Sequence, residues 1–463
     1  MPLDKLQKIH DWLWEIPQDF RSDMRVPARV YASEKMLQEI SRDRSLLQLI
    51  NVATLPGIQK YALVMPDAHE GYGFPIGGVA AFDIETGVIS PGGIGYDVNC
   101  GIRLLKSKLT VNEVRPHLEK LATAIYQEVP SGVGRGGRLT LKGRDLDLVL
   151  EQGAEQLVKL DYGQAEDLER LESGGVLRDA DATLVSATAK ARGRDQLGTL
   201  GAGNHFVEIE KVEMVYDAAA AQELGFFENQ VTVLIHTGSR GLGHQVATDY
   251  IRVMIPAMNK YQIEIPDREL ACAPFGSTEG QNYFHAMAAA ANFAWANRQL
   301  ITEEVRRAWR NVLGQAGGAL GVVYDIAHNI AKIEEYEGQK LVVHRKGATR
   351  AFPGQPVLIP GSMGTGSWVL VGQKAALEQS FGSSCHGAGR RMSRTQAKRE
   401  VEGNQLKKEL ARRGVVVKAG SLSGLAEEAP QAYKNVDEVV EVIHQAGLAK
   451  KVARLMPLAV IKG

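Results

Sequence analysis

The chain has 463 residues, 44% of them hydrophobic, which is enough for a sizeable core in one large domain or in roughly two to three ordinary ones. Its 54 Lys and Arg residues balance its 54 Asp and Glu residues, so net charge excludes no class of partner. Three cysteines are too few for a disulfide framework in a chain of this length, which favours a reducing compartment. The sequence shows neither the apolar segment of a secretory signal nor a run of roughly 18 apolar residues, so we expect a cytoplasmic protein without a membrane span.

The first hundred residues show two different patterns. Residues 1–50 have helical spacing, interrupted near Pro17 and Pro27. Beyond them, short β-prone runs alternate with glycine-dense turns, which predicts strands at 61–65, 78–82, 88–89 and 102–105.

The remainder of the chain mixes helices with further strands. Helical spacing of Leu, Val and Ile predicts helices within 111–129 and 143–173, and an Ala-rich stretch predicts another at 281–313. Strands and turns are expected at 199–210, at 231–236 and across 319–385. The prediction ends with a charged helix at 394–413, a helix at 435–448 and a strand that reaches Lys462 and Gly463.

Helices and strands are segregated along the chain rather than strictly alternating, which favours an α+β fold. No linker rich in Pro or Ser divides the chain, and no repeat is visible. We therefore expect a single large domain over residues 1–463, with a mixed or antiparallel β-sheet core flanked by helices. A polar helical insertion is expected at about 140–200.

The segment 90–101 places Asp97 and Cys100 three residues apart among four glycines. Glycines let the backbone turn tightly and approach a ligand closely, so both side chains could face one ion. A buried structural cysteine beside a turn aspartate would explain the pair equally simply.

Three histidines, His205, His236 and His328, border turns at the ends of apolar runs. Any one of them could be a buried core histidine with a satisfied hydrogen bond. Several polar ligands at strand ends favour a site, because strand ends and their loops are where sites are commonly built.

One Asp, one Cys and three His are too few for two closed tetrahedral metal sites. They suit two ions that share a bridging thiolate and keep open positions, which is typical of catalytic metal. Paired metal ions stabilise attacking and leaving oxygens in phosphoryl chemistry. The ligand types suit zinc at least as well as manganese, so they do not select the metal.

His386 lies on a turn of small residues at 383–389 and opens a basic stretch. From His386 to Lys418 there are ten Lys or Arg residues against three Glu. Such a stretch could meet an anion such as nucleic acid, or could form a solvated helix face. The backbone amides of this turn and of a second loop at 360–367 could cradle phosphate. Neither loop matches the P-loop or the dinucleotide fingerprint, so ordinary glycine turns remain an alternative.

A neutral imidazole is a competent nucleophile toward phosphorus when cations neutralise the phosphate oxygens. This makes His386 a candidate for a covalent phosphoramidate; its alternatives are a further metal ligand or a hydrogen-bond donor to phosphate. Position and charge also suggest four phosphate contacts for RNA or nucleotide: Arg240, Arg345, Arg350 and Arg390.

Taken together, the motifs resemble those of the RtcB RNA-splicing ligases over nearly the whole chain. The motifs, in chain order, are Met65-Pro66-Asp67-Ala68-His69, the 92–101 segment around Asp97 and Cys100, Gly203-Asn204-His205-Phe206, His236-Thr237-Gly238-Ser239-Arg240-Gly241, Ala327-His328-Asn329, His344-Arg345-Lys346-Gly347-Ala348, Cys385-His386-Gly387-Ala388-Gly389-Arg390 and the terminal Lys462-Gly463. The resemblance is weakest around 140–200.

The resemblance implies a GTP-dependent ligase that uses two Mn²⁺ ions. Such an enzyme joins an RNA 3′-phosphate or 2′,3′-cyclic phosphate end to a 5′-hydroxyl end, through GMP-histidine and RNA-3′-pp-5′-G intermediates, in tRNA splicing and RNA repair. RNA is therefore the expected partner. The resemblance also raises archease as a helper protein, without deciding whether this chain needs one.

The resemblance also assigns residues. It implies Asp97, Cys100, His205, His236 and His328 as metal ligands, with Cys100 bridging. It implies His386 as the guanylylated residue and Asp67 as the carboxylate that orients its ring. The implied GMP contacts are Asn204, His205, Phe206, Val207, Glu208, His328, Asn329, Pro360, Gly361, Ser362, Met363, Ser367, His386, Gly387, Ala388, Gly389, Tyr433 and Lys462.

Two other classes of function stay open. A binuclear metal-dependent phosphodiesterase would share the metal ligands but would have no use for the His386 turn. A non-catalytic RNA-binding repair accessory would be expected to lack one or more ligands, whereas all five are present.

Overall fold

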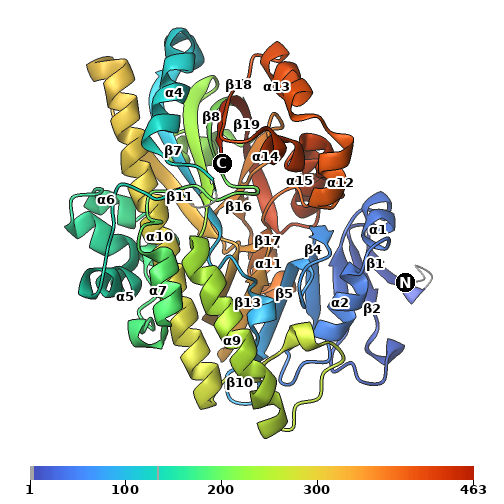
Figure 1. The fold of residues 1–463 in the computed structure, drawn as a ribbon. Helices are drawn as coiled ribbons and strands as arrows, with labels where there is room; N and C mark the ends of the chain where they lie inside the picture. Colours follow the sequence, from blue (N-terminus) through green and yellow to red (C-terminus); the bar gives the residue numbers. More distant parts are fainter. Residues whose placement is uncertain (1–4, 133–134) are drawn as a thin grey trace.

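The computed structural model describes residues 5–132 and 135–463. Two large β-sheets form the centre of the molecule, and helices cover their outer faces (Figure 1). This arrangement confirms the expected α+β fold with mainly antiparallel sheets flanked by helices. None of the helices in these ranges is both long and apolar enough to cross a membrane.

The first sheet has seven strands. In spatial order they are β1 (Gln7–His10), β2 (Leu13–Ile16), β3 (Ala28–Tyr31), β4 (Ala62–His69), β5 (Ile76–Asp83), β13 (Gln339–Lys346) and β12 (Asn329–Tyr336). All neighbours are antiparallel except β3 and β4, which run parallel. The helices α1 (Glu34–Ile40), α2 (Ser45–Val52), α11 (Lys374–Ser380) and α15 (Val436–Gln445) share its hydrophobic core.

The second sheet has eight strands. Its main path is β11 (Gly321–Ala327), β7 (Gly101–Thr110), β9 (Gln230–Thr237), β8 (Phe206–Val215), β19 (Ala449–Lys462), β16 (Ser367–Gly372) and β15 (Pro356–Ile359), and β18 (Val416–Ala419) pairs with β19 in parallel. Two small sheets join β6 (Val88–Ile89) to β10 (Ala273–Pro274) and β14 (Ala348–Arg350) to β17 (Ser383–Cys385).

One face of the second sheet packs on the largest hydrophobic cluster, which contains residues of α4 (Leu118–Glu128), α5 (Arg144–Lys159), α9 (Arg240–Lys260) and α10 (Thr278–Leu313). The other face packs on α8 (Ala218–Leu224), α13 (Gly403–Arg412) and α14 (Leu422–Glu427). The short helices α3 (Val111–Val114), α6 (Ala165–Leu168), α7 (Ala187–Gly193) and α12 (Arg394–Glu400) complete the order.

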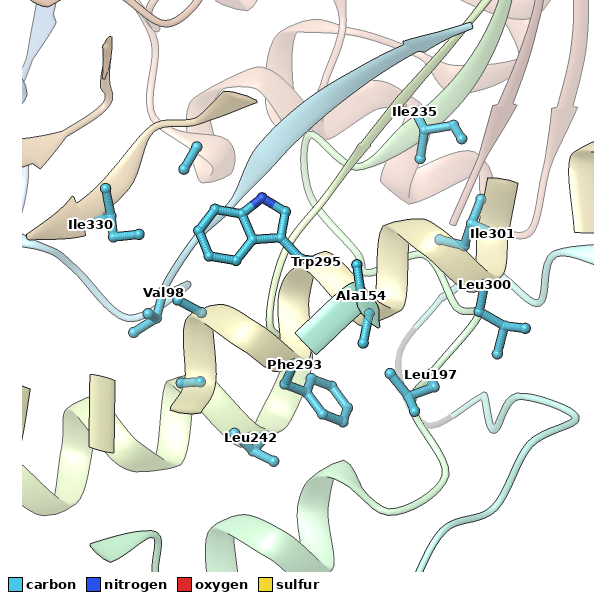
Figure 2. Close-up of a cluster of buried hydrophobic side chains, with 14 of the residues drawn as sticks. Val98, Ala154, Leu197, Ile235, Leu242, Phe293, Trp295, Leu300, Ile301 and Ile330 are labelled. Atoms are coloured by element: carbon cyan, nitrogen blue, oxygen red, sulfur yellow. The ribbon is translucent and has the colours of Figure 1, made fainter. Parts of the chain in front are cut away.

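The long helix α10 lies behind the strands of the second sheet. Ser277 caps it by accepting a hydrogen bond from the backbone N–H of Gly280. Alanines along its middle let neighbouring elements approach closely, while Phe293 and Trp295 project from opposite sides of the helix (Figure 2). Both aromatic side chains are fully buried. The buried helix therefore supports the residues at the ends of the strands that pack against it.

The prediction that residues 1–50 are helical is wrong over most of its length. Residues 5–50 form β1, β2 and β3, and their helical parts are α1, the start of α2 and a short 3-10 helix at Gln18–Phe20. The strands exist because β3 pairs with β4, which lies about 30 residues further along the chain, and local spacing does not reveal such a partner. The predicted helix at 394–413 is two helices, because Val401 and Glu402 have extended backbone angles. The helix expected at 435–448 is confirmed as α15.

The stretch from 140 to 200 is helical as predicted, with α5, α6 and α7 in it. Its apolar side chains, among them Leu150, Leu157 and Ala189, belong to the same cluster as α10. Whether this stretch is an insertion within a single domain stays a prediction.

Candidate active site

Four strands of the second sheet carry polar residues at or next to strand ends that lie close together. Cys100 directly precedes β7, and His328 directly follows β11. The antiparallel register pairs Gly101 with both Thr237 and Ala327, so the start of β7 meets the ends of β9 and β11. His236 lies near the end of β9, opposite Phe206 of β8, and His205 comes just before that strand. Strand pairing therefore gathers four residues that are up to 228 positions apart in sequence.

The gathered atoms lie within a few ångströms of one another. The Sγ atom of Cys100 is 3.3 Å from Nε2 of His205 and 3.4 Å from Nε2 of His236. Nε2 of His236 is in turn 3.4 Å from Nε2 of His328, and Oδ2 of Asp97 is 2.9 Å from Nε2 of His205. These atoms form two groups that could each hold a cation, Cys100–His236–His328 and Asp97–Cys100–His205, and both groups include the thiol.

The chemistry of the donors fits a cation better than a hydrogen-bond network. Burial lowers the pKa of His236 and His328 well below 6.5, so both rings are neutral and can offer a lone pair. Cys100 has a single thiol proton, which cannot satisfy two imidazole nitrogens at once. Burial raises the pKa of this thiol well above 9.0, so a bound cation would have to displace its proton.

Asp97 is held in place by backbone groups. Its Oδ1 accepts from the N–H of Ser239 at 3.1 Å, and its carbonyl accepts from Nδ2 of Asn329. Burial raises the pKa of Asp97, but the hydrogen bond and charge of His205, the hydrogen bond from Cys100 and the charge of Arg240 together outweigh it, and the net pKa is below 3.8. The group is therefore a carboxylate at neutral pH and can act as an oxygen ligand.

His386 forms a second, distinct unit with Asp67. The Nδ1 atom of His386 lies 2.6 Å from Oδ2 of Asp67, which also accepts from the backbone N–H of His386 at 3.0 Å. Asp67 is fully buried on β4, and His386 follows β17. Gly389, at φ +72°, allows the turn to approach so closely that a Cβ there would lie 2.0 Å from the carbonyl oxygen of Asp67. The ring of His386 stands edge-on to that of His328, with 4.9 Å between their centroids.

A pair of buried carboxylic acids lies beside the cluster. Glu208 and Glu210 are two residues apart on β8 and therefore share a face of the strand. Burial, together with their mutual repulsion, raises the pKa of Glu208 well above 4.5, and burial raises the pKa of Glu210 to about 7. Lys462 is buried nearby, 5.5 Å above the ring of Phe206, and burial lowers its pKa to about 8. Its Nζ has no hydrogen-bond partner among the described residues.

The other expected contact residues fall into two groups. The loop at 360–363 abuts the His386 turn, since a Cβ on Gly387 would lie 3.6 Å from the carbonyl oxygen of Pro360. Tyr433 also joins it, because its hydroxyl accepts from Arg390 at 3.1 Å. Val207, by contrast, has its side chain in the hydrophobic cluster under the sheet, so it can reach a ligand only through its backbone.

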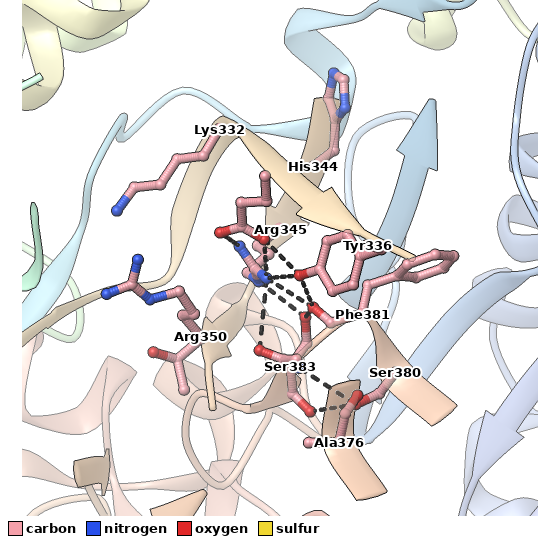
Figure 3. A network of polar contacts seen from close by, with 12 residues as sticks. Lys332, Tyr336, His344, Arg345, Arg350, Ala376, Ser380, Phe381 and Ser383 are labelled. Carbon is pink, nitrogen blue, oxygen red and sulfur yellow. Dashed lines mark hydrogen bonds and ion pairs between the residues drawn. The ribbon is translucent and has the colours of Figure 1, made fainter. Parts of the chain in front are cut away.

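The suggestion that Arg345 contacts phosphate is wrong. Its guanidinium is fully buried and binds both carboxylate oxygens of Glu334 at 2.8 Å (Figure 3). It also donates to Ser383 and to the carbonyl of Phe381. Strand β13 lies between β5 and β12 in the first sheet, and the guanidinium forms a buried ion pair within the fold. Arg240, Arg350 and Arg390 are less buried and keep the suggested role as a prediction.

Two cavities lie near the site, one at the ligand cluster and one beside the His386 turn. One, of about 410 Å³, is lined by Asp97 and His205 together with Arg192, Arg240, Tyr96, His244 and others. The other, of about 730 Å³, lies beside the His386 turn and is lined by Arg42, His69, Arg390, Arg391, Arg394 and Lys434 among others. Arginines line both cavities and can bind an anionic ligand, and the larger cavity is also lined by Glu39, Asp43 and Glu70.

Sequence reasoning missed several residues of this region. Glu210 could have been found, because alternate positions on a strand share a face with Glu208. Arg192 and His244 carried no such signal, since they reach the smaller cavity from α7 and α9 and are not part of any motif. Their position depends on how helices pack on the sheet.

A histidine–carboxylate pair beside a cluster of cation ligands, at the edge of an α+β sheet, defines a metal-dependent enzyme. Within this class the chain belongs to the RtcB family, since residues 48–463 match the family model described as tRNA-splicing ligase RtcB. The tRNA-splicing ligase RtcB of Thermococcus kodakarensis is 54% identical, with 100% of this chain and 99% of that protein covered. The protein of the same name from Archaeoglobus fulgidus is 53% identical, with 99% of each covered. The RNA-splicing ligase RtcB of Mycobacterium tuberculosis is 50% identical over 90% of this chain and 100% of its own length.

Proposed function

We propose that this protein is a GTP-dependent RNA ligase that joins a 3′-phosphate or 2′,3′-cyclic phosphate end to a 5′-hydroxyl end in tRNA splicing and RNA repair. The observation that carries the proposal is the position of His386. Asp67 fixes its ring, and the ring lies against His328 of the cation-ligand cluster. A hydrolase with the same cluster would not need a buried carboxylate to orient a histidine outside it.

The ligand cluster supports two divalent cations, which we take to be Mn²⁺. One would be held by Cys100, His236 and His328, and the other by Cys100, Asp97 and His205. When bound, such cations would neutralise charge on phosphate oxygens. The donors also suit Zn²⁺, so the choice of manganese rests on the family.

Glu208 supports GTP as the nucleotide. Its Oε1 atom is buried and has no partner in the described part of the chain. Guanine presents two neighbouring N–H donors on its Watson–Crick edge, whereas adenine presents an acceptor at the same place. Burial raises the pKa of Glu208, and two N–H donors would favour its ionised form, so a guanine edge would offset that burial and fits this site better than adenine. The remaining proposed GMP contacts are those that the family resemblance assigned, from Asn204 to Lys462.

The reaction that we propose has three transfers. Nε2 of His386 bonds to the α-phosphorus of GTP, and the bond to pyrophosphate breaks. An oxygen of the RNA 3′-phosphate then bonds to that phosphorus, and the bond to Nε2 breaks. Finally the 5′-hydroxyl oxygen bonds to the RNA 3′-phosphorus, its proton passes to solvent, and the bond to GMP breaks so that GMP leaves. A 2′,3′-cyclic phosphate end is first opened by water, which breaks the bond to the 2′-oxygen and leaves a 3′-phosphate. Throughout, Asp67 keeps the proton of His386 on Nδ1, so that Nε2 carries the lone pair.

The two cavities support RNA as the substrate. Each opens beside the ligand cluster or the His386 turn, and each offers arginines that can bind backbone phosphates. In the smaller one, the rings of Tyr96 and His244 are stacked with centroids 4.7 Å apart, which offers an aromatic surface to an unpaired base. Adding archease to the ligation assay tests whether this chain needs that helper protein.

The decisive experiment is incubation with α-labelled GTP and Mn²⁺, followed by denaturation and measurement of label on the protein. Wild type should retain acid-labile label, and His386→Ala should retain none. His117→Ala, which changes an exposed histidine, is the matched control and should behave as wild type. Label on His386→Ala would refute the nucleophile, and absence of label on wild type would favour the phosphodiesterase or the non-catalytic accessory.

A further inference from the structure

One buried arginine behind the ligand cluster uses every donor that it has. Arg298 lies on α10 and is fully buried. Its Nε and one Nη2 hydrogen bind the two carboxylate oxygens of Asp325, both at 2.9 Å. The other Nη2 hydrogen binds Oδ1 of Asn99 at 3.0 Å, and Nη1 binds the carbonyl oxygens of Asn99 and Thr237, both at 2.9 Å. These five bonds account for all five N–H groups of a guanidinium.

The three partners of Arg298 are neighbours of three cation ligands. Asn99 is bonded to Cys100 at the start of β7, and Thr237 follows His236 at the end of β9. Asp325 lies on β11, three residues before His328. One rigid, planar group therefore contacts all three strands that supply the group Cys100–His236–His328.

The residues around Arg298 hold its partners in place and leave room for its guanidinium. Asp325 accepts further bonds from Arg103 at 2.8 Å and from the indole of Trp295 at 3.0 Å, so it cannot rotate away. Gly101 leaves room for the guanidinium, since a Cβ there would lie 3.0 Å from Nη1 of Arg298 and 2.1 Å from the carbonyl of Ile326. The preceding helix residue, Asn297, binds the carbonyl of Gly238 at 3.1 Å and so holds the loop beyond β9 to the same helix.

We propose that Arg298 is a positioning residue for the cation ligands: by joining the ends of β7, β9 and β11 to α10, it fixes the spacing of Cys100, His236 and His328. The proposal rests on the cation-binding part of the proposed function. It requires an arginine specifically, because a lysine keeps the charge but has three donors on one atom and cannot reach acceptors on three strands. A metal site needs ligand positions fixed to a few tenths of an ångström. Loss of the Arg298 hydrogen bonds should therefore weaken metal binding before it unfolds the chain.

Helix α10 also carries Arg306, which serves as a matched control. This arginine is also buried, and it binds both oxygens of Asp167 at 2.6 and 2.7 Å and the carbonyl of Leu320 at 3.0 Å. It contacts none of the residues next to the cation ligands. Arg298→Lys and Arg306→Lys therefore remove comparable buried pairs from one helix, and only the first should alter the metal site.

The experiment titrates the metal-free full chain with Co²⁺ and follows the thiolate-to-cobalt charge-transfer absorption, with urea unfolding measured in parallel. We expect Arg298→Lys to bind Co²⁺ about tenfold or more weakly and with a changed band, because supporting residues typically contribute about 10- to 100-fold to metal affinity. Arg306→Lys should lose stability but keep the wild-type affinity and band. Equal Co²⁺ binding by folded Arg298→Lys and wild type would overturn the inference and leave the proposed function standing.

A milder variant covers the case in which Arg298→Lys does not fold. Asn99→Gly keeps a residue that tolerates the observed φ of +51° but removes the Oδ1 acceptor of Arg298. It should weaken Co²⁺ binding by a smaller factor than Arg298→Lys, and wild-type affinity and spectrum in this variant would overturn the inference. If wild type itself shows no thiolate band, the proposed metal site fails, and the inference fails with it.

Discussion

The Nδ1 atom of His386 lies 2.6 Å from Oδ2 of Asp67, although 319 positions separate the two residues in the chain. The same carboxylate oxygen accepts the backbone N–H of His386 at 3.0 Å. One buried oxygen thus fixes both the turn and the ring. With Nδ1 bound to Asp67, Nε2 is the nitrogen left to act as a nucleophile, and the ring lies 4.9 Å from that of His328 between centroids.

Asp67→Asn should slow guanylylation of the protein. An amide can still accept the hydrogen bond, but it lacks the negative charge that stabilises the ring when Nε2 bonds to phosphorus. We expect the rate of GMP attachment to fall about 10²-fold or more. The measurement is single-turnover transfer of label from GTP. Glu438→Gln, at an exposed salt bridge with Lys35, is the control and should not change the rate.

Metal binding should release a proton from the thiol and none from His236 or His328. Burial puts the pKa of Cys100 well above 9.0 and those of His236 and His328 well below 6.5, so at pH 7 the thiol carries a proton to lose and these two rings do not. Calorimetric titration of the metal in buffers of different ionisation enthalpy should show release of about one proton from Cys100, and affinity should rise with pH. Cys100→Ser should abolish the release, whereas Cys272→Ser, at a buried thiol away from the cluster, should keep it. No proton release from wild type would count against a thiolate ligand.

Glu208→Gln should reduce the preference for GTP. The glutamine side chain offers one acceptor and one donor, so one of the two guanine N–H groups would face an N–H. Loss of one of these two hydrogen bonds should raise the KM for GTP about tenfold or more, with a smaller effect on any activity with ATP. Competition between labelled GTP and unlabelled nucleotides measures the change. Glu213→Gln changes an exposed residue of the same strand and should leave the preference intact.

Glu304→Gln should stabilise the protein more at pH 8 than at pH 5. Burial raises the pKa of Glu304 to about 9 from an ordinary 4.5. The folded chain therefore holds a proton that the unfolded chain loses above pH 4.5, so its contribution to stability declines as pH rises from 4.5 toward 9. Glutamine does not titrate and avoids this decline. Thermal unfolding of wild type and variant at both pH values measures this difference in stability, with the exposed Glu335→Gln as control. An equal shift in melting temperature at both pH values would contradict the assignment.

Much of the site could be predicted from sequence because its reactive residues lie in short, recognisable segments. Glycine-rich turns carry Asp97, Cys100, His205 and His386, and the type of each ligand is visible in the residue itself. The helix α10 was predicted because its sequence is rich in alanine, a strong helix former, and α15 was predicted as well. The strands at the N-terminus were not, because they depend on pairing with one another and with β4, and the four residues of each give little periodic signal.

The sequence alone determined which residues can bind a cation, carry a phosphoryl group or turn the backbone, because those properties belong to individual side chains and to their immediate neighbours. Only the tertiary structure decided which charged groups serve the site. Arg345 and Arg298 are equally cationic, yet one is an internal tie to Glu334 and the other contacts the three ligand strands. The physical reason is that a guanidinium acts on whatever acceptors surround it, and strand pairing and helix packing over long sequence distances choose those acceptors.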